Sequence, residues 1–340
     1  MINFRKYELP FKTPFVTAAG SFSHREGILI EGEACGIRFS GDASPLPGFS
    51  TETCNEVHQF LNEHKASIET LFSNHKKLTD FDKQCIELQA PPSVRFGMST
   101  AMGNVLATQK GLSLAHYLNP LSQPRIPVNV TLGARPSYAL LDDALKAWEE
   151  GYKTFKVKVG QDPDAELESL IRIRKHLPEC HLRIDANGAW NVDQAIQILN
   201  KFAPTRIEYC EQPVGANDLK SFITVKRNSP IPIAADESIR SFSDATHFIQ
   251  LQAVDVLILK PMLIGTISEF NKIIELADSN DIAVVVTTSL ESGIGRRATA
   301  QLAACQKNQP FAHGLATGRL LQNDILDDSA HFKNGFYYPG

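Results

Sequence analysis

Two lysines and three carboxylates stand at nearly equal spacings in the second half of the chain. They are Lys158, Asp185, Glu211, Asp236 and Lys260, each 24 to 27 positions from the next. Each stands at or just after the end of a short run of strand-forming residues. A lysine with a lowered pKa can take or return a proton, and carboxylates can hold a divalent cation. The set predicts metal-assisted proton transfer.

Asp185, Glu211 and Asp236 are expected at the ends of three successive strands. Three unpaired carboxylates at one place repel one another, and a hard cation removes that repulsion. Oxygen ligands with positions left for water and substrate suit Mg²⁺ better than Zn²⁺, with Mn²⁺ as a possible substitute. The alternative is that the three side chains cap separate helices or form salt bridges.

Lys156 and Lys158 stand two positions apart in the run KVKV. The period of a strand places both on one face, and the flanking valines then face the buried helix side. Two neighbouring ammonium groups disfavour each other's charge, so Lys156 is expected to tune Lys158 toward the pKa of a base. Lys260 is expected on the opposite wall. The alternatives are exposed strand lysines for the pair and a side chain snorkelling to solvent for Lys260.

Eight short β-branched runs must position these residues, and helical patterns separate them. The runs are IPVNVTLG, TFKVKVG, HLRIDANG, RIEYCEQP, PIAADES, VDVLILKP, IAVVVTTS and FAHGLAT. Strands that alternate with helices form parallel sheets, and eight at near-constant spacing favour a closed barrel over an open sheet. The predicted fold class is therefore α/β, with a TIM-like barrel whose C-terminal strand ends form the active-site face.

The chain is predicted to have two domains. Residues 1–120 read as a smaller α+β module, because two alternating runs (2–11 and 27–40) precede a helical pattern at 53–72. Residues 121–317 form the catalytic barrel. Residues 318–340 follow the eighth strand as a tail that could return to pack on the first module.

The composition excludes several kinds of protein. With 43% hydrophobic and 21% charged residues, the 340-residue chain can bury a large core. Its net charge of −4 leaves no basic excess for nucleic acid. No apolar run reaches the roughly 20 residues needed to span a bilayer. We expect a cytoplasmic protein that acts on a small-molecule carboxylate, with no nucleic-acid or membrane partner; the oligomeric state stays open.

Five motifs together resemble the muconate-cycloisomerase subgroup of the enolase superfamily. They are KVKVG, RIDANGAW, EYCEQPV, AADESI and LILKP. The resemblance covers nearly the whole chain and implies a (β/α)₇β barrel with an N-terminal capping domain. It also implies Mg²⁺ on Asp185, Glu211 and Asp236, and acid/base chemistry by Lys158 and Lys260. A lysine base that works with Mg²⁺ on an enediolate is typical of that superfamily.

Further stretches resemble the o-succinylbenzoate synthases of menaquinone synthesis. They are residues 7–27, SPLPGFSTET, SVRFGMSTA, SLESGIGR and HGLATGRLL. Dipeptide epimerases of the subgroup usually carry Asp-x-Asp after the eighth strand to hold the substrate amine, whereas this chain has GLATG there. This difference argues against dipeptide substrates.

The resemblance implies dehydration of 2-succinyl-6-hydroxy-2,4-cyclohexadiene-1-carboxylate to 2-succinylbenzoate. Lys158 would take the proton α to the carboxylate and return it to the departing hydroxide, while Lys260 would hold charge over the ring as a cation. The side chains and backbone groups expected to contact the substrate are Gly20, Ser21, Asn187, Ser289 and Gly314.

Three other functions stay open. The nearest rival is N-succinylamino acid racemase, alone or as a second activity, because it uses the same metal and both lysines. A muconate-type cycloisomerase fits the flanking motifs less well. A non-catalytic scaffold on this fold would not need five polar residues at five strand ends.

Three side chains near these motifs receive a structural interpretation. Trp190 is expected in the core. His313 is expected to be a satisfied structural histidine, because a lone His is weak evidence of a base. Arg183 shares a face with Asp185, so it is expected lower in the barrel beside a buried carboxylate.

Overall fold

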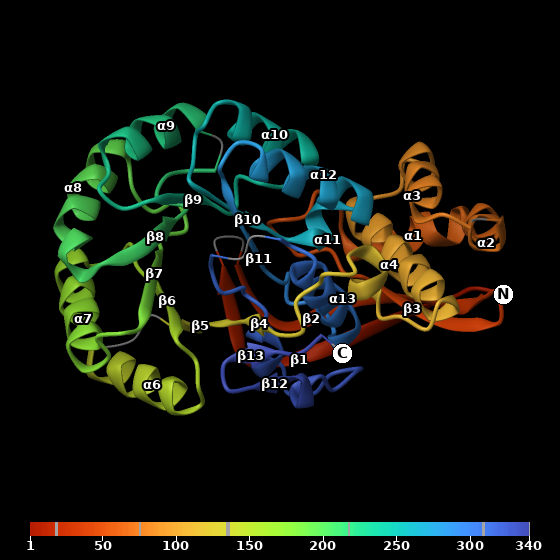
Figure 1. The fold of residues 1–340 in the computed structure, drawn as a ribbon, viewed down its shortest axis with the longest axis horizontal. Helices are drawn as coiled ribbons and strands as arrows, with labels where there is room; N and C mark the ends of the chain where they lie inside the picture. Colours follow the sequence, from red (N-terminus) through yellow and green to blue (C-terminus); the bar gives the residue numbers. More distant parts are fainter. Residues whose placement is uncertain (18–19, 75, 134–136, 217, 308–309, 340) are drawn as a thin grey trace.

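The second half of the chain folds as parallel strands joined by helices (Figure 1). The computed structural model describes residues 1–17, 20–74, 76–133, 137–216, 218–307 and 310–339. Seven strands are hydrogen-bonded in the order β11-β10-β9-β8-β7-β6-β5. Their bounds are β5 (Asn129–Leu132), β6 (Thr154–Lys158), β7 (His181–Asp185), β8 (Ile207–Glu211), β9 (Ile233–Ala235), β10 (Val256–Leu259) and β11 (Ala283–Val286). Sequential neighbours all pair in parallel, as the alternation of strand and helix predicts.

The eighth run joins the two edges of this sheet. His313 forms a parallel bridge with Val128, and Gly314 forms one with Thr287. The run was expected to be a full strand, but it pairs only through these isolated bridges. At Gly314 the packing leaves no room for a side chain, since an added Cβ would lie 2.4 Å from Thr287 Oγ1. The (β/α)₇β prediction is confirmed.

Helices cover the outside of the barrel (Figure 1). They are α6 (Ser137–Glu149), α7 (Pro163–His176), α8 (Val192–Phe202), α9 (Leu219–Asn228), α10 (Phe242–Gln250), α12 (Ile267–Asp278) and α13 (Gly293–Ala304), with the short α11 (Pro261–Ile264) after β10. Capping boxes begin two of them: Asn191 with Gln194 at α8, and Thr266 with Glu269 at α12. The first cap starts α8 directly after the loop that follows Asp185, and the second starts α12 after the short α11 that follows Lys260.

The N-terminal residues form a three-stranded antiparallel sheet with helices packed on it. Its elements are β1 (Asn3–Thr17), β2 (Gly20–Ala34), β3 (Ile37–Ala43), α1 (Cys54–Glu63), α2 (Lys65–Asn74), α3 (Leu78–Glu87), α4 (Pro92–Gln109) and α5 (Leu114–Leu118). A turn divides the alternating run 27–40 between β2 and β3, with Cys35 at φ 53° and Gly36 at φ 75°. The helical pattern at 53–72 is likewise divided at His64, the C-cap of α1.

Buried polar contacts join this sheet and its helices to the barrel. Asp82 of α3 accepts hydrogen bonds from Ser99 Oγ of α4 (2.6 Å) and from Ser268 Oγ of α12 (2.6 Å). On the other side, Asp42 of β3 accepts from Ser292 Oγ (2.7 Å), directly before α13. The module is therefore held against two barrel segments that follow β10 and β11.

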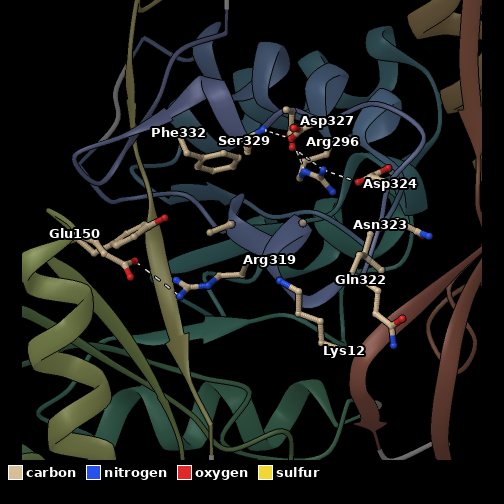
Figure 2. A pocket seen from close by; sticks show the side chains of 15 residues that line it. Lys12, Glu150, Arg296, Arg319, Gln322, Asn323, Asp324, Asp327, Ser329 and Phe332 are labelled. Carbon is tan, nitrogen blue, oxygen red and sulfur yellow. Dashed lines mark hydrogen bonds and ion pairs between the residues drawn. The ribbon is translucent and has the colours of Figure 1, made fainter.

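The last residues run along the outside of the barrel and contact β1. They contain η2 (Ala316–Leu320), η3 (Ser329–His331), β12 (Phe332–Lys333) and β13 (Phe336–Tyr337), which pairs with β4 (Ile126–Pro127). Leu321 forms an antiparallel bridge with Phe11. In Figure 2, Arg296 of α13 binds Asp324 of this segment, at 2.7 Å. Each helix in the described part of the chain is too short or too polar to span a bilayer.

Candidate active site

The predicted strand-end residues lie side by side at one edge of the barrel. Lys158 on β6 is the register partner of Asp185 on β7, and Asp185 is the register partner of Glu211 on β8. Asp236 and Lys260 directly follow β9 and β10. Parallel strands lie about 4.8 Å apart, so these side chains share one layer at the C-terminal edge. The β6 and β10 positions are four apart in a ring of eight, which places Lys158 and Lys260 on opposite walls.

Lys156 and Lys158 both bind Asp185. Their Nζ atoms lie 3.1 and 2.6 Å from its Oδ2, and Lys156 also lies 2.8 Å from Glu211 Oε1. Although burial opposes its charge, the attraction of Glu211 and Asp185 raises the pKa of Lys156 above its ordinary value. Lys156 is thus a positively charged partner of both carboxylates. The sequence pattern predicted only that Lys156 would tune Lys158 toward the pKa of a base.

Lys260 pairs with Asp236 on the far wall. Its Nζ also lies 5.0 Å from the centre of the Phe49 ring, which the N-terminal module supplies from the loop before α1. Burial lowers the pKa of Lys260 to about 7. The backbone N–H of Asp236 donates to Gln212 Oε1 at 3.0 Å, which ties the loop after β8 to that after β9.

The carboxylates offer the donor chemistry of a hard cation. Asp185 and Glu211 are 0% and 1% exposed. Burial raises the pKa of Glu211, and the charge of Asp185 raises it further, which is the repulsion that a cation would relieve. Among the described residues no three acidic, His or Cys groups form a ready-made metal cluster. Instead each predicted ligand is paired with a lysine, the salt-bridge arrangement left open above. The all-oxygen donor set nevertheless fits Mg²⁺.

Three of the residues expected to contact substrate are found near the strand ends. Asn187 is exposed and accepts a hydrogen bond from Lys158 Nζ at 2.7 Å. Ser289 follows β11 and is buried, and its Oγ has no hydrogen-bond partner among the described residues. The bridge from Gly314 to Thr287 leaves no room for a side chain, so packing alone explains why this residue is glycine.

The remaining two, Gly20 and Ser21, begin β2 and are exposed. Gly20 adopts φ 133°, a conformation that glycine readily provides. Residues 18–19 of the same motif lie outside the described part of the chain. Contact of Gly20 and Ser21 with substrate therefore stays a prediction.

The three side chains interpreted as structural are all buried, but two of them differ from the prediction in their partners. Trp190 is buried. Arg183 is buried two positions before Asp185, level with Lys156 in the strand register and at the register shift between β7 and β8. It binds Glu208 at 2.7 Å, a carboxylate that is partly exposed rather than buried as predicted. His313 Nδ1 accepts from the Val286 backbone N–H, and burial together with the nearby Arg183 charge lowers the pKa of His313 to about 3. Its Nε2 is buried and has no hydrogen-bond partner among the described residues, so the prediction of a satisfied histidine holds for one ring nitrogen only.

Several polar contacts at this edge were not predicted from the sequence. Glu237 accepts a hydrogen bond from Asn187 Nδ2 at 2.7 Å. Glu291, fully buried after Ser289, accepts from Thr299 Oγ1 at 2.7 Å. The position of Glu237 and Glu291 in the sequence could have indicated them, because both follow strand ends in the recognised motifs ADES and SLES.

A separate cavity of about 600 Å³ lies beneath the C-terminal residues (Figure 2). Its walls include Lys12, Tyr152, Arg296 and Arg319. None of the residues that line it belongs to the predicted catalytic or metal-binding set. The cavity is therefore separate from the predicted active site.

Comparison with known proteins identifies the family. Residues 139–340 match the model of the enolase C-terminal domain-like family, and residues 1–105 match the MenC N-terminal domain. An o-succinylbenzoate synthase of Thermobifida fusca is 36% identical over 60% of this chain and 63% of its own. An L-Ala-D/L-Glu epimerase of Francisella tularensis subsp. novicida is 30% identical over 88% of this chain and 85% of its own.

A solved structure agrees in fold. The dipeptide epimerase from Cytophaga hutchinsonii, complexed with Mg and the dipeptide D-Ala-L-Val, has a TM-score of 0.85 and 25% identity, covering 98% of this chain and 91% of its own. This chain therefore shares its architecture with an epimerase and its sequence similarity with both a synthase and an epimerase. The chain belongs to the enolase superfamily and is an enzyme.

Proposed function

We propose that this enzyme is an o-succinylbenzoate synthase of menaquinone synthesis. It would dehydrate 2-succinyl-6-hydroxy-2,4-cyclohexadiene-1-carboxylate to 2-succinylbenzoate with Mg²⁺, or Mn²⁺, held by Asp185, Glu211 and Asp236. The observation that carries the reaction class is the position of Lys158 beside Asp185 and Glu211, with Lys260 on the opposite wall. This arrangement supports removal of a proton α to a carboxylate.

The two lysines have different tasks in this proposal. Lys158 accepts the α-proton and returns it to the departing hydroxide, which leaves as water. Lys260, in its protonated form, holds positive charge over the ring, beside Phe49. Lys156 holds Asp185 and Glu211 in place through its two ion pairs. A bound divalent cation supplies electrostatic stabilisation of the charge that develops on the substrate carboxylate.

The choice of substrate depends on other parts of the chain. The match of residues 1–105 to the MenC N-terminal domain favours the synthase, because this module supplies Phe49 to the site. The run GLATG, in place of Asp-x-Asp after the eighth strand, offers no carboxylate for the amine of a dipeptide. Both features favour a substrate that carries a succinyl group and lacks a free amine.

A dehydration assay tests the proposal. The purified enzyme with Mg²⁺ should convert the cyclohexadiene carboxylate to 2-succinylbenzoate, and EDTA should stop turnover until Mg²⁺ is restored. Lys158→Ala should lower kcat by at least about 100-fold, the scale of general base catalysis. Asp193→Asn, at an exposed carboxylate of α8, is a matched control with unchanged kcat. Turnover retained in Lys158→Ala would refute the mechanism.

The two opposed lysines also favour a second candidate, N-succinylamino acid racemase. A racemase must exchange protons on both faces of the α-carbon, and burial gives Lys260 a pKa of about 7, suited to acid/base work. Lys260→Ala should then abolish racemisation of N-succinyl amino acids, since one face would lack its lysine. Racemisation as fast as dehydration in the unmodified enzyme would make this a second activity.

A further inference from the structure

A chain of hydrogen bonds reaches Lys158 from a residue with no assigned role. Glu237 Oε1 accepts from Asn187 Nδ2 at 2.7 Å, and Asn187 Oδ1 accepts from Lys158 Nζ at 2.7 Å. Lys158 donates in turn to Asp185 Oδ2 at 2.6 Å. The chain joins the ends of β6, β7 and β9.

Asn187 needs such a partner to have a defined orientation. Its side chain is exposed, and an amide can turn over so that its N–H₂ and its oxygen exchange places. A carboxylate accepts but does not donate, so Glu237 selects the orientation in which Nδ2 faces it. Asn187 Oδ1 then faces Lys158. The backbone supports this placement, because Asn187 N–H donates to Asp185 Oδ1 at 3.1 Å.

This orientation decides where the lone pair of Lys158 points. A neutral lysine amine has two N–H groups and one lone pair in a tetrahedral arrangement. When the two N–H groups donate to Asp185 and Asn187, the lone pair must take the remaining direction. If Asn187 were reversed, its N–H₂ would donate to that lone pair and compete with the substrate proton.

Glu237 is otherwise free for this task. Its Oε2 is buried and has no hydrogen-bond partner among the described residues. We propose that Glu237 is a positioning residue that, through the amide of Asn187, directs the lone pair of Lys158 toward the substrate. The inference rests on the proposed function, in which Lys158 is the base.

Glu237→Leu and Glu237→Gln test it together. Leucine removes the acceptor, whereas the glutamine oxygen can still accept from Asn187 Nδ2. The measurement is α-proton exchange in D₂O with Mg²⁺ for each enantiomer of an N-succinyl amino acid. Lys158→Ala and Lys260→Ala identify which enantiomer reports on which lysine.

Glu237→Leu should slow exchange on the Lys158 face by about 10- to 100-fold and leave the Lys260 face within about twofold, because only the base on β6 is misdirected. Glu237→Gln should lose less than Glu237→Leu, because a glutamine amide can pair with Asn187 in either orientation and so selects the productive one only part of the time. Equal loss on both faces, or no loss on the Lys158 face, would overturn the proposal. A general effect on folding or metal binding would slow both faces alike.

Neutron crystal structures of the metal-free variants, which distinguish the amide oxygen from its N–H₂ group, test the same inference without catalysis. In Glu237→Leu, Asn187 Oδ1 should no longer lie within hydrogen-bond distance of Lys158 Nζ, and in Glu237→Gln both orientations of the Asn187 amide should be populated. An unchanged Asn187 in Glu237→Leu would overturn the positioning role. Inactivity of the unmodified enzyme in dehydration and in exchange would instead count against the proposed function, and the structures would still decide the role of Glu237.

Discussion

Asp185 and Glu211 are direct register partners on β7 and β8, and the ammonium group of Lys156 binds both carboxylates, at 3.1 and 2.8 Å. The parallel register places two buried negative charges next to each other, which costs free energy unless a cation lies between or beside them. Lys156 supplies that charge from the strand next to β7. The site therefore has a built-in cation where the sequence predicts a metal ion.

We expect Lys156→Met to lower the free energy of unfolding by about 3 kcal/mol or more in metal-free buffer, because two buried carboxylates lose a common partner. Urea denaturation measures the change. Mg²⁺ should stabilise this variant more than the unmodified enzyme, since it would restore the missing positive charge.

The matched control is Lys175→Met, at an exposed position of α7, where the change should stay within about 0.5 kcal/mol. If Mg²⁺ raised the free energy of unfolding of Lys156→Met and of the unmodified enzyme by the same amount, the metal ion and the lysine would not neutralise the same carboxylates. That result would contradict the prediction.

Arg296 anchors the C-terminal residues to α13 through a buried fork of hydrogen bonds. Its Nε and Nη2 bind both oxygens of Asp328, at 2.7 and 2.6 Å, and Nη2 also binds Asp324. Lysine cannot reproduce this bidentate geometry. Arg296→Lys should therefore cost about 3 kcal/mol of unfolding free energy, measured by denaturation in urea.

Arg319→Lys serves as the comparison in the same region. Arg319 is about half exposed and lies 3.8 Å from Glu150, so its substitution should cost less than about 1 kcal/mol. Figure 2 shows both arginines at one cavity. If the two variants lost equal stability, the anchoring role of Arg296 would be wrong.

Burial raises the pKa of Asp42, which accepts hydrogen bonds from Tyr7 Oη and Ser292 Oγ. The folded protein thus keeps this proton to a higher pH than the unfolded chain. Between the two pKa values the folded state binds more protons, so the free energy of unfolding falls as pH rises. The contribution is fully present below the unfolded pKa and is lost as pH rises through the folded pKa.

Asp42→Asn should remove this dependence. The measurement is the slope of unfolding free energy against pH, which should be less negative for the variant than for the unmodified protein in that window. Asp142→Asn, at an exposed position of α6, should keep the slope of the unmodified protein. Parallel curves for Asp42→Asn and the unmodified protein would show that Asp42 does not titrate differently on folding.

The barrel could be predicted because each of its units is contiguous in sequence. A strand, its loop and the next helix follow within about 25 residues, so the spacing from Lys158 to Lys260 reports the order of strands directly. The boundaries within the N-terminal module were less predictable. The turn at Cys35 and Gly36 interrupts a run whose alternation continues across it.

Hydrogen-bond partners that come from distant segments could not be predicted. Glu237 lies 50 positions from Asn187, and Asp42 lies 250 positions from Ser292, so no local pattern links either pair. Phe49 lies over Lys260 only because the N-terminal module packs on the barrel. These contacts depend on how whole domains dock.

The sequence by itself determined the fold class, the strand-end position of the two lysines and three carboxylates, and the family. Residue type and the two-residue period of a strand are sufficient for these predictions. They specify the face of the sheet on which a side chain lies and whether it lies at the end of its strand. Only the tertiary structure decided that Lys156 binds two carboxylates at once and that Glu237 reaches Lys158 through Asn187. Hydrogen bonds form within a few tenths of an ångström, and strand register, bulges and domain packing set distances at that scale.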